Sequence, residues 1–245
     1  MLIVESWRVV DGHIAALDAH RARFLSSCRR HAPDLAVSAF EEAWSEFLLQ
    51  LPAHGDFFPR LQFDTETKAF RQAVRPSPVR PPTATFWCAP AGDPRRHPEV
   101  KGPDLDLLAG LRAQATAAGA QEALILAPDG TVVEGAYTAV VWWEESTLCV
   151  RDDSLPRLPS VTEERLLGIC ARRGIPIRRG RLDSRLLSSH ETWIVNSLDQ
   201  VRLLVSEPGS AGAGLRAESD RPTFSRRFDE LSAALWSGWA PLPSC

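Results

Sequence analysis

Lysine is scarce in this sequence, and its scarcity restricts any chemistry that depends on a primary amine. Of the 28 lysine and arginine residues, only Lys68 and Lys101 are lysines. A positioned lysine forms covalent bonds with carbonyl groups and carries protons, whereas an arginine stays charged and does neither. Lys101 stands in HPEVKGPDLDLL, between a predicted strand and a predicted helix. A lone lysine is usually a solvated surface residue, but its rarity here favours Lys101 as a functional amine.

Five further segments occur in a recognisable order. They are ESWRVVDG with LDAHRARFLSSC, then HPEVKGPDLDLL, QEALILAPDGTVVEGAYTAVVWW, LPSVTEERLL and ETWIVNSLDQVRLL. In this order they resemble the fold-type IV (class IV) pyridoxal-phosphate enzymes, which include branched-chain and D-alanine aminotransferases and aminodeoxychorismate lyase. The resemblance extends from about Glu5 to Leu204. It implies an α+β fold of two domains, similar to D-amino acid aminotransferase, with pyridoxal 5'-phosphate in the interdomain cleft. It also implies a homodimer.

The resemblance assigns catalytic roles to two residues. It implies that Lys101 forms a Schiff base with the cofactor and then moves a proton at the substrate α-carbon. The spacing Lys101-x-x-Asp104-Leu is similar to the K-x-x-N-L of the D-alanine aminotransferase and lyase branches. Glu134 matches the family's carboxylate beside the pyridine nitrogen, where a negative charge favours the protonated, electron-accepting ring. A turn glutamate at the end of a hairpin is the alternative for Glu134.

The cofactor's phosphate requires cationic side chains and N–H donors, and three segments match this need. Arg23 matches the family's phosphate arginine, whose forked guanidinium suits a dianion. In LPSVT, the backbone N–H groups of Val161 and Thr162 begin a predicted helix, and a helix N-terminus attracts phosphate. Asn196 and Ser197 match the family's residues on the other side of the phosphate. A surface arginine and an ordinary helix N-cap are the alternatives for Arg23 and Thr162.

The sequence defines a substrate pocket less closely. Ser6, Arg8 and Tyr137 are the candidates to line it. Two positions depart from the family pattern: Ala139 stands where asparagine is usual, and Glu163 follows LPSVT where arginine or lysine is usual. No metal site is expected, because the six histidines are scattered along the chain.

Three functions remain open at this point. The resemblance predicts an enzyme that acts on a small amino acid or amine, first of all an aminotransferase. The spacing after the lysine also suits a C–N lyase similar to aminodeoxychorismate lyase, which forms p-aminobenzoate and pyruvate. The hydroxyl residue of that lyase falls on Ser6. A catalytically inactive binding homologue is the third possibility, which Ala139 and Glu163 favour and the retained lysine, glutamate and phosphate arginine oppose.

Four prolines between Arg75 and Pro82 mark a boundary, because proline disrupts helix interiors and central strands. We expect residues 1–80 to form a smaller α+β domain and residues 81–245 a larger α/β domain that carries the cofactor lysine. A Gly- and Ser-rich loop is expected over 206–222. Apolar periodicity predicts helices over about 14–25, 38–51, 103–118, 162–173 and 224–236. It predicts strands over about 5–10, 58–63, 69–74, 85–88, 122–126, 131–133, 139–143, 148–150, 175–177 and 192–195.

Composition excludes several classes of protein. The net charge of −3 and the absence of basic runs argue against a nucleic-acid partner. The longest nearly apolar run, residues 136–143, is far shorter than the ~20 residues that span a bilayer. Five cysteines without a CxxC pair indicate reduced thiols, from which we expect a cytoplasmic protein.

Overall fold

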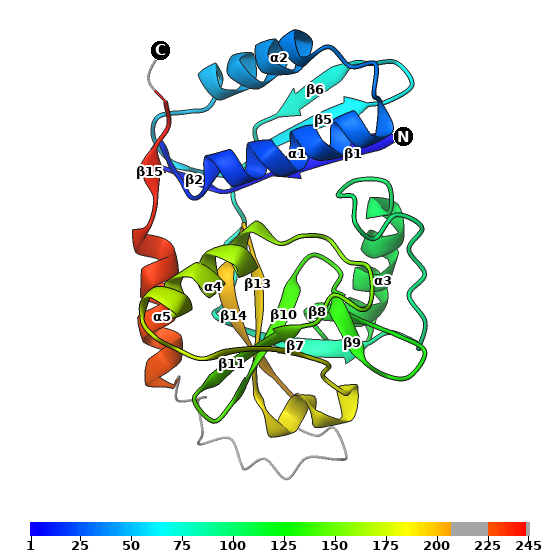
Figure 1. The fold of residues 1–245 in the computed structure, drawn as a ribbon, viewed down its shortest axis with the longest axis vertical. Helices are drawn as coiled ribbons and strands as arrows, with labels where there is room; N and C mark the ends of the chain where they lie inside the picture. The colour runs from blue at the N-terminus through cyan, green and yellow to red at the C-terminus, as the bar shows by residue number, and fades with distance from the viewer. Residues whose placement is uncertain (207–224, 244–245) are drawn as a thin grey trace. The chain divides into compact units, whose positions relative to one another are not determined.

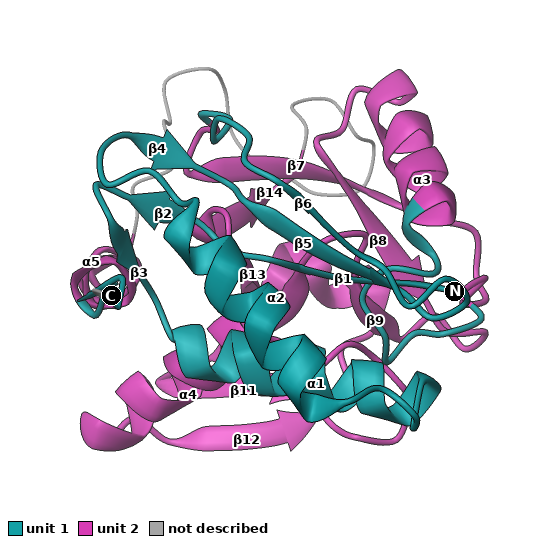
Figure 2. Cartoon of the chain, turned by 90° about the horizontal axis from the view of Figure 1, so that it is seen from above, with its two compact units in different colours: residues 1–79, 96–105, 238–245 teal, residues 80–95, 106–237 magenta. Residues whose placement is uncertain are grey.

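The computed structural model describes residues 1–206 and 225–243. Their contacts divide the chain into two compact units, coloured separately in Figure 2. Unit 1 comprises residues 1–79, 96–105 and 238–245, and unit 2 comprises residues 80–95 and 106–237. One unit boundary falls between Val79 and Arg80, and the loop that carries Lys101 belongs to unit 1.

Unit 1 combines two small antiparallel sheets with two helices (Figure 1). The first sheet has the order β1 (Leu2–Ser6), β5 (Arg60–Asp64) and β6 (Phe70–Ala73). The second has the order β15 (Ala240–Pro241), β3 (His13–Ile14), β2 (Val9–Val10) and β4 (Asp56–Phe57). The helices are α1 (Leu17–His31) and α2 (Val37–Leu49).

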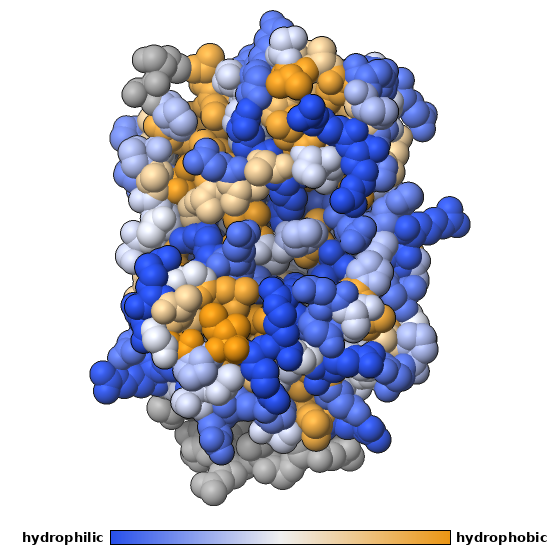
Figure 3. Space-filling view, viewed as in Figure 1, coloured by the Kyte–Doolittle hydropathy of each residue, from blue (hydrophilic) through white to orange (hydrophobic). Residues whose placement is uncertain are grey.

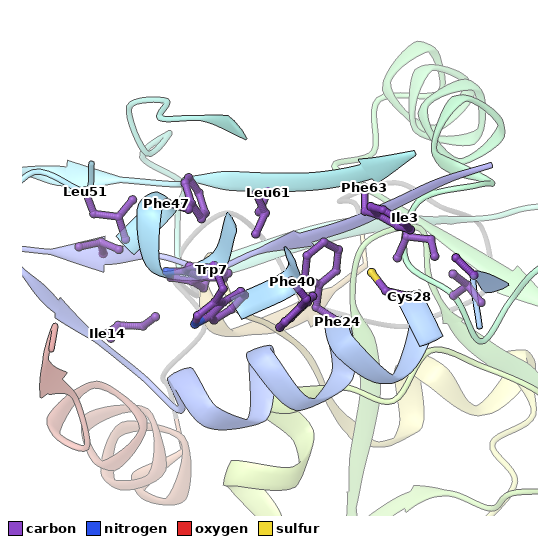
Figure 4. Packing of buried hydrophobic residues seen from close by; sticks show 14 residues of the cluster. Ile3, Trp7, Ile14, Phe24, Cys28, Phe40, Phe47, Leu51, Leu61 and Phe63 are labelled. Carbon is purple, nitrogen blue, oxygen red and sulfur yellow. The ribbon is translucent and has the colours of Figure 1, made fainter. Parts of the chain in front are cut away.

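Aromatic side chains fill the core of unit 1. Ile3 and Trp7 are four residues apart and therefore lie on the same side of the β1 segment. Both point toward the helices, where they belong to one core cluster with Phe24 and Phe40 (Figure 4). Each of these side chains is at most 1% exposed. Burial of a side chain of this size contributes roughly 1.5–3 kcal/mol. Because Glu5 lies between Ile3 and Trp7 in the same period of two, its side chain faces the same helices.

Unit 2 is built on a curled sheet of eight strands, with order β12-β11-β10-β13-β14-β7-β8-β9. The strands are β7 (Thr83–Cys88), β8 (Glu122–Leu126), β9 (Val132–Gly135), β10 (Ala139–Glu144), β11 (Thr147–Arg151), β12 (Ile177–Gly180), β13 (Glu191–Asn196) and β14 (Gln200–Val205). The helices are α3 (Leu105–Ala117), α4 (Val161–Arg172) and α5 (Arg226–Ser237), with a 3₁₀ turn, η1, at Ser184–Ser189.

Both faces of this sheet are covered. On one face, side chains of β10, β11 and β13 pack against α4 and α5 around Trp193 and Leu166, which are fully buried. Helix α3 packs Leu111 and Ala115 against Ile125 of β8. A third apolar cluster includes Val140 and Trp142 of β10, Cys149 of β11 and Ile194 of β13. Apolar side chains therefore cover both faces of these strands. This explains why β8 and β10 are continuous hydrophobic runs in the sequence.

The structure contains the helices and strands that periodicity predicted, with shifted ends. The helix after Lys101 begins at Leu105, and the first strand begins at Leu2. Strands β3, β4, β14 and β15 were not predicted. Most of the expected loop over 206–222 lies outside the described residues. In the described residues no helix is long and apolar enough to cross a membrane. Hydrophilic side chains cover most of the face shown in Figure 3.

Candidate functional site

Lys101 lies in the loop between β7 and α3 and is tied to the first strand of the chain. Its carbonyl oxygen accepts a hydrogen bond of 2.8 Å from the backbone N–H of Val4. Gly102 has φ +140°, and a Cβ at this position would lie 2.2 Å from the carbonyl oxygen of Leu2. Only glycine therefore permits the close approach of this loop to β1. The position of the Lys101 backbone is set by this contact.

Glu5 of β1 forms the centre of a buried group of basic side chains. Arg23 donates from Nε to Glu5 Oε2 over 2.9 Å and from Nη2 to Oε1 over 2.6 Å. His20 Nδ1 lies 3.1 Å from Glu5 Oε1, and Lys101 Nζ lies 3.7 Å from the same oxygen. One carboxylate thus faces three basic side chains. We refer to Glu5, His20, Arg23 and Lys101 as the Glu5 cluster.

Local structure explains why these residues meet. His20 and Arg23 are three residues apart on α1, so both lie on the helix face that packs on β1. Glu5 alternates with the core residues of β1 and points toward that face. The loop contact at Gly102 brings the lysine to the same strand. The Glu5 cluster lies wholly within unit 1.

The pKa values in this cluster follow from burial and charge. Burial opposes ionisation of Glu5, but the charges of Arg23, Lys101 and His20 outweigh it and hold the Glu5 pKa well below its usual range. Burial lowers the pKa of Lys101 to about 8, although the charge of Glu5 raises it in part. Burial also lowers the pKa of His20. Lys101 is consequently a lysine whose neutral amine is accessible near neutral pH.

Glu134 of β9 forms the centre of a second group, within unit 2. Register places Glu134 opposite Ile125 of β8, and its side chain is buried. Arg95 donates from Nη1 to Glu134 Oε1. The same guanidinium holds Asp93 through Nε and Nη2, over 2.9 and 2.6 Å. The backbone N–H of Leu158, in the LPSVT segment, also donates to Glu134.

Arg157 and Glu163 flank the LPSVT segment and pair with each other. Arg157 donates to the two carboxylate oxygens of Glu163 over 2.8 and 2.5 Å. Ser160 caps helix α4 by accepting the backbone N–H of Glu163 over 3.2 Å. The family's basic residue after this segment is thus replaced by an acid that has its own arginine partner. We refer to Asp93, Arg95, Glu134, Arg157 and Glu163 as the Glu134 cluster.

The pKa of Glu134 moves in the opposite direction from that of Glu5. Burial raises it, and the charges of Arg95 and Arg157 offset the rise only in part. The hydrogen bonds to Asp93 and Glu134 outweigh burial and raise the pKa of Arg95. Arg95 therefore remains a cation, and its charge limits the rise in the Glu134 pKa.

The other expected phosphate residues also lie in unit 2. Val161 and Thr162 begin helix α4 and are buried. Asn196 does not present a free amide: its Oδ1 accepts the backbone N–H groups of Leu198 and Asp199 over 2.9 and 2.7 Å. It therefore shapes the turn between β13 and β14. The carbonyl oxygen of the neighbouring Ser197 accepts a hydrogen bond from Gln200 in the same turn.

The three substrate-pocket candidates belong to different units. Ser6 is buried at the end of β1, and Arg8 forms a two-point ion pair with Asp56 in unit 1. Tyr137 lies in unit 2 between β9 and β10, with the guanidinium of Arg112 5.2 Å from its ring centroid. Arg8 is thus occupied by a structural ion pair.

Comparison with known proteins decides the family. The sequence profile of amino-transferase class IV matches residues 2–206. The chain belongs to the class IV amino-transferase family. No curated protein was found to match the sequence.

Solved structures of other class IV enzymes share the fold. A putative 4-amino-4-deoxychorismate lyase from Legionella pneumophila is 17% identical, with a TM-score of 0.77. The superposition covers 97% of this chain and 91% of the lyase. An aminotransferase from Brucella abortus bound to PLP is 18% identical, with a TM-score of 0.75 and coverages of 96% and 87%. A branched-chain aminotransferase from Thermoproteus uzoniensis is 15% identical, with a TM-score of 0.77 and coverages of 99% and 90%. These similarities establish the two-domain α+β fold of this class IV chain.

The donor groups of this class IV chain fit pyridoxal phosphate. A partly buried amine with a pKa of about 8 suits bond formation with an aldehyde, since only the neutral amine is nucleophilic. A carboxylate such as Glu134 suits a protonated ring nitrogen. The N-terminus of α4 suits a phosphate group.

Sequence reasoning missed several charged residues of the two clusters. Glu5 stands inside ESWRVV, but the resemblance to the family assigns no role to it. Arg95 and Arg157 were two among many arginines. Their carboxylate partners are the signal that could have found them: Glu163 is the acid that departs from the family pattern, and an arginine precedes the same segment by one residue.

Proposed function

We propose that this chain is a pyridoxal-phosphate-dependent aminotransferase that acts on an amino acid or amine. The observation that carries the proposal is the partly buried amine of Lys101, whose pKa is about 8 and whose partner is Glu5. The only other lysine, Lys68, is bound to Asp34 at the surface. Membership of the class IV family supports the same assignment.

Pyridoxal phosphate, when bound, supplies an aldehyde for the substrate amine and a ring that takes up electrons from the α-carbon. Lys101 is the residue that would hold the cofactor through its aldehyde carbon. When the substrate amine takes its place, the neutral Nζ would accept the proton from the substrate α-carbon and deliver it to the carbon that carried the aldehyde. Glu5 holds the ammonium form between these two transfers. Glu134 would pair with the protonated ring nitrogen, and the Arg95 charge favours the ionised form of that carboxylate.

We assign the phosphate to Arg23, to the backbone N–H groups of Val161 and Thr162, and to Ser197. Arg23 is fixed by its two hydrogen bonds to Glu5, so its guanidinium loses little freedom when it meets an anion. A helix N-terminus adds backbone donors and a favourable dipole. These groups bind and orient, and none of them is proposed to move a proton.

Borohydride reduction of the PLP-loaded protein tests the proposal. We expect a reduced pyridoxyl label on the tryptic peptide that contains Lys101, and conversion of amino donors with a keto-acid acceptor. Lys68→Met is the control and should keep the label, whereas Lys101→Met should lose it. A label on Lys68, or no label at all, would contradict the assignment and would favour an inactive binding homologue.

One observation favours the lyase as a second candidate. Ser6 is 3% exposed, and its backbone N–H donates to Glu5 over 3.0 Å, so a hydroxyl residue adjoins the Glu5 cluster. A lyase would release p-aminobenzoate and pyruvate from aminodeoxychorismate without a keto-acid acceptor. Ser6→Ala should then reduce p-aminobenzoate release and leave the Lys101 label unchanged. Transamination with no p-aminobenzoate release would exclude this candidate.

A further inference from the structure

Arg151, at the end of β11, is a buried arginine whose guanidinium is only partly bonded. The residue is 3% exposed. Its Nη2 donates to the carbonyl oxygen of Leu155. Its Nε and Nη1 atoms are buried and have no hydrogen-bond partner among the described residues.

Other buried arginines of unit 2 show how unusual this is. Arg95 and Arg157 each hold a carboxylate through two nitrogens. Arg202, which is 4% exposed, donates from Nε to the carbonyl oxygen of Pro81 and from Nη2 to the oxygens of Thr83 and Gln121, over 2.6–2.8 Å. Arg151 has one carbonyl oxygen only. Of these four arginines, it alone keeps buried N–H donors without an acceptor.

The acids near Arg151 are already bonded to other groups. Glu134 and Glu163 lie close enough to influence Arg151, but their carboxylates are held by Arg95 and Arg157. The carboxylate of Asp152 accepts the backbone N–H of Ser154 over 3.0 Å and also its hydroxyl. Burial lowers the pKa of Arg151, and the charge of Arg157 lowers it further. An unpaired buried cation of this kind is destabilising unless an anion compensates it.

We propose that Arg151 is the binding residue of a small-oxyanion site within unit 2, one that takes a phosphate or carboxylate group. The two guanidinium nitrogens of Arg151 that have no acceptor suit such a group. The Arg151 site does not depend on the proposed enzyme function, because the cofactor-free protein alone should bind the anion. The oxyanion has two possible sources, the phosphate of the cofactor and a carboxylate of the substrate.

Thermal unfolding of the cofactor-free protein, in a buffer without phosphate or carboxylate, tests the site. Inorganic phosphate or malonate, at about a hundredfold excess over its Kd, should raise the Tm of the wild type by about 5 °C. Arg151→Met should unfold at the same temperature as the wild type or higher when no anion is present, and should lose the response. Arg151→Lys should keep part of it.

Two control variants separate this site from other effects. Arg202→Met removes a buried arginine that is fully bonded, so it should lower the Tm and keep the anion response. Arg23→Ala removes the residue that we assign to the cofactor phosphate, so a response that persists in this variant belongs to Arg151. An unchanged response in Arg151→Met, or no response in the wild type, overturns the site and leaves the proposed function untouched.

Measurements on the protein with pyridoxal phosphate distinguish the two sources of the oxyanion. If Arg151 meets the cofactor phosphate, Arg151→Met should weaken pyridoxal phosphate binding about tenfold and leave the binding of pyridoxal unchanged. If it meets a substrate carboxylate, the same variant should raise the KM of amino acids about tenfold, and leave cofactor affinity and the KM of simple amines unchanged. Wild-type affinity for all of these ligands in Arg151→Met contradicts the site.

Discussion

Two buried glutamates of this chain, Glu5 in unit 1 and Glu134 in unit 2, have basic partners, and yet their pKa values shift in opposite directions. Glu5 accepts two hydrogen bonds from Arg23 and lies beside Lys101 and His20. Glu134 accepts from Arg95, but Arg95 also holds Asp93. The pKa of Glu5 is lowered, whereas that of Glu134 is raised.

This comparison shows that burial does not decide the protonation of a carboxylate by itself. The decisive quantity is the number of carboxylates that share each cation. In the Glu5 cluster one acid serves three basic groups, so the lysine can lose its proton while the acid stays ionised. In the Glu134 cluster each arginine is matched to acids of its own, so the charge on Glu134 is more easily altered by a ligand.

Removal of Lys101 should have the largest effect on activity. Lys101→Met should reduce turnover by at least about a thousandfold, because both the covalent attachment and the proton carrier are lost. Lys68→Met should retain wild-type turnover. Steady-state kinetics with the best amino donor measure both, and circular dichroism checks that each variant is folded. Turnover of Lys101→Met within tenfold of wild type would remove the lysine from the mechanism.

Removal of the Glu5 charge should mainly affect stability. Glu5→Gln leaves Arg23 buried without its carboxylate, which costs about 3–5 kcal/mol of unfolding free energy. Since the native pKa of Glu5 is lowered from 4.5, its stabilisation is present above about pH 4.5 and is lost as the pH falls through the native pKa. Denaturant unfolding at several pH values should show this acid dependence in wild type and not in Glu5→Gln. Glu41→Gln, at a half-exposed pair with Arg21, is the control.

Glu134→Gln tests the second cluster. If its charge supports the ring nitrogen, the variant should still bind cofactor but lose about 3 kcal/mol of transition-state stabilisation, which slows turnover more than a hundredfold. Glu144→Gln, at an exposed ion pair with Arg178, should change turnover little. Single-turnover absorbance measures proton transfer directly. Wild-type rates in Glu134→Gln would make this residue a structural glutamate of the hairpin.

Arg23→Ala should weaken cofactor binding with a smaller effect on chemistry. A charge-assisted hydrogen bond is worth about 1.5–3 kcal/mol, so the Kd of pyridoxal phosphate should rise about 10- to 100-fold. Excess cofactor should restore most of the turnover, and pyridoxal should bind wild type and variant alike. Arg21→Ala, on the same helix, should bind pyridoxal phosphate as wild type does. Equal phosphate dependence in Arg23→Ala and wild type would place this arginine outside the phosphate site.

The smallest expected effect is a shift in the titration of Lys101. Acetylation of the cofactor-free protein at a series of pH values should give a midpoint near pH 8 for Lys101. Arg60→Gln removes a positive charge that lowers the Lys101 pKa, so its midpoint should move to higher pH. Lys68, which is exposed, reports the amount of active reagent in the same digest. A midpoint near 10.5 in wild type would show that Lys101 is solvated.

The sequence identifies the chemical residues better than their partners. Lys101 and Glu134 stand in segments that resemble a known family, and lysine scarcity supports the first independently. Their partners come from distant positions: Arg23 meets Glu5 across 18 residues, and Arg95 meets Glu134 across 39. No local spacing encodes such pairs, because the fold brings them together.

The helices and strands show the same difference between local sequence patterns and contacts that only the fold creates. Amphipathic helices such as α1 and α2 show an apolar period, and buried strands such as β8 and β10 show short apolar runs, and a sequence alone displays both. Strand β14 was missed, and its residues Arg202 and Gln200 are buried polar groups that interrupt an apolar pattern. The assignment of residues 96–105 to unit 1 depends on the contact between Val4 and Lys101, which is a tertiary event.

The approach of Gly102 to Leu2 has a consequence for mutational tolerance. Any side chain at 102 would collide with backbone and not with a flexible group, so no rotamer change can relieve it. A library that varies the first strand in length or register should therefore be screened together with the lysine loop. Insertions before Leu2 leave the contact intact, whereas a one-residue deletion within β1 would shift the carbonyl that Gly102 accommodates. The tolerance of the Lys101 segment to mutation thus depends on the first residues of β1, against which it packs.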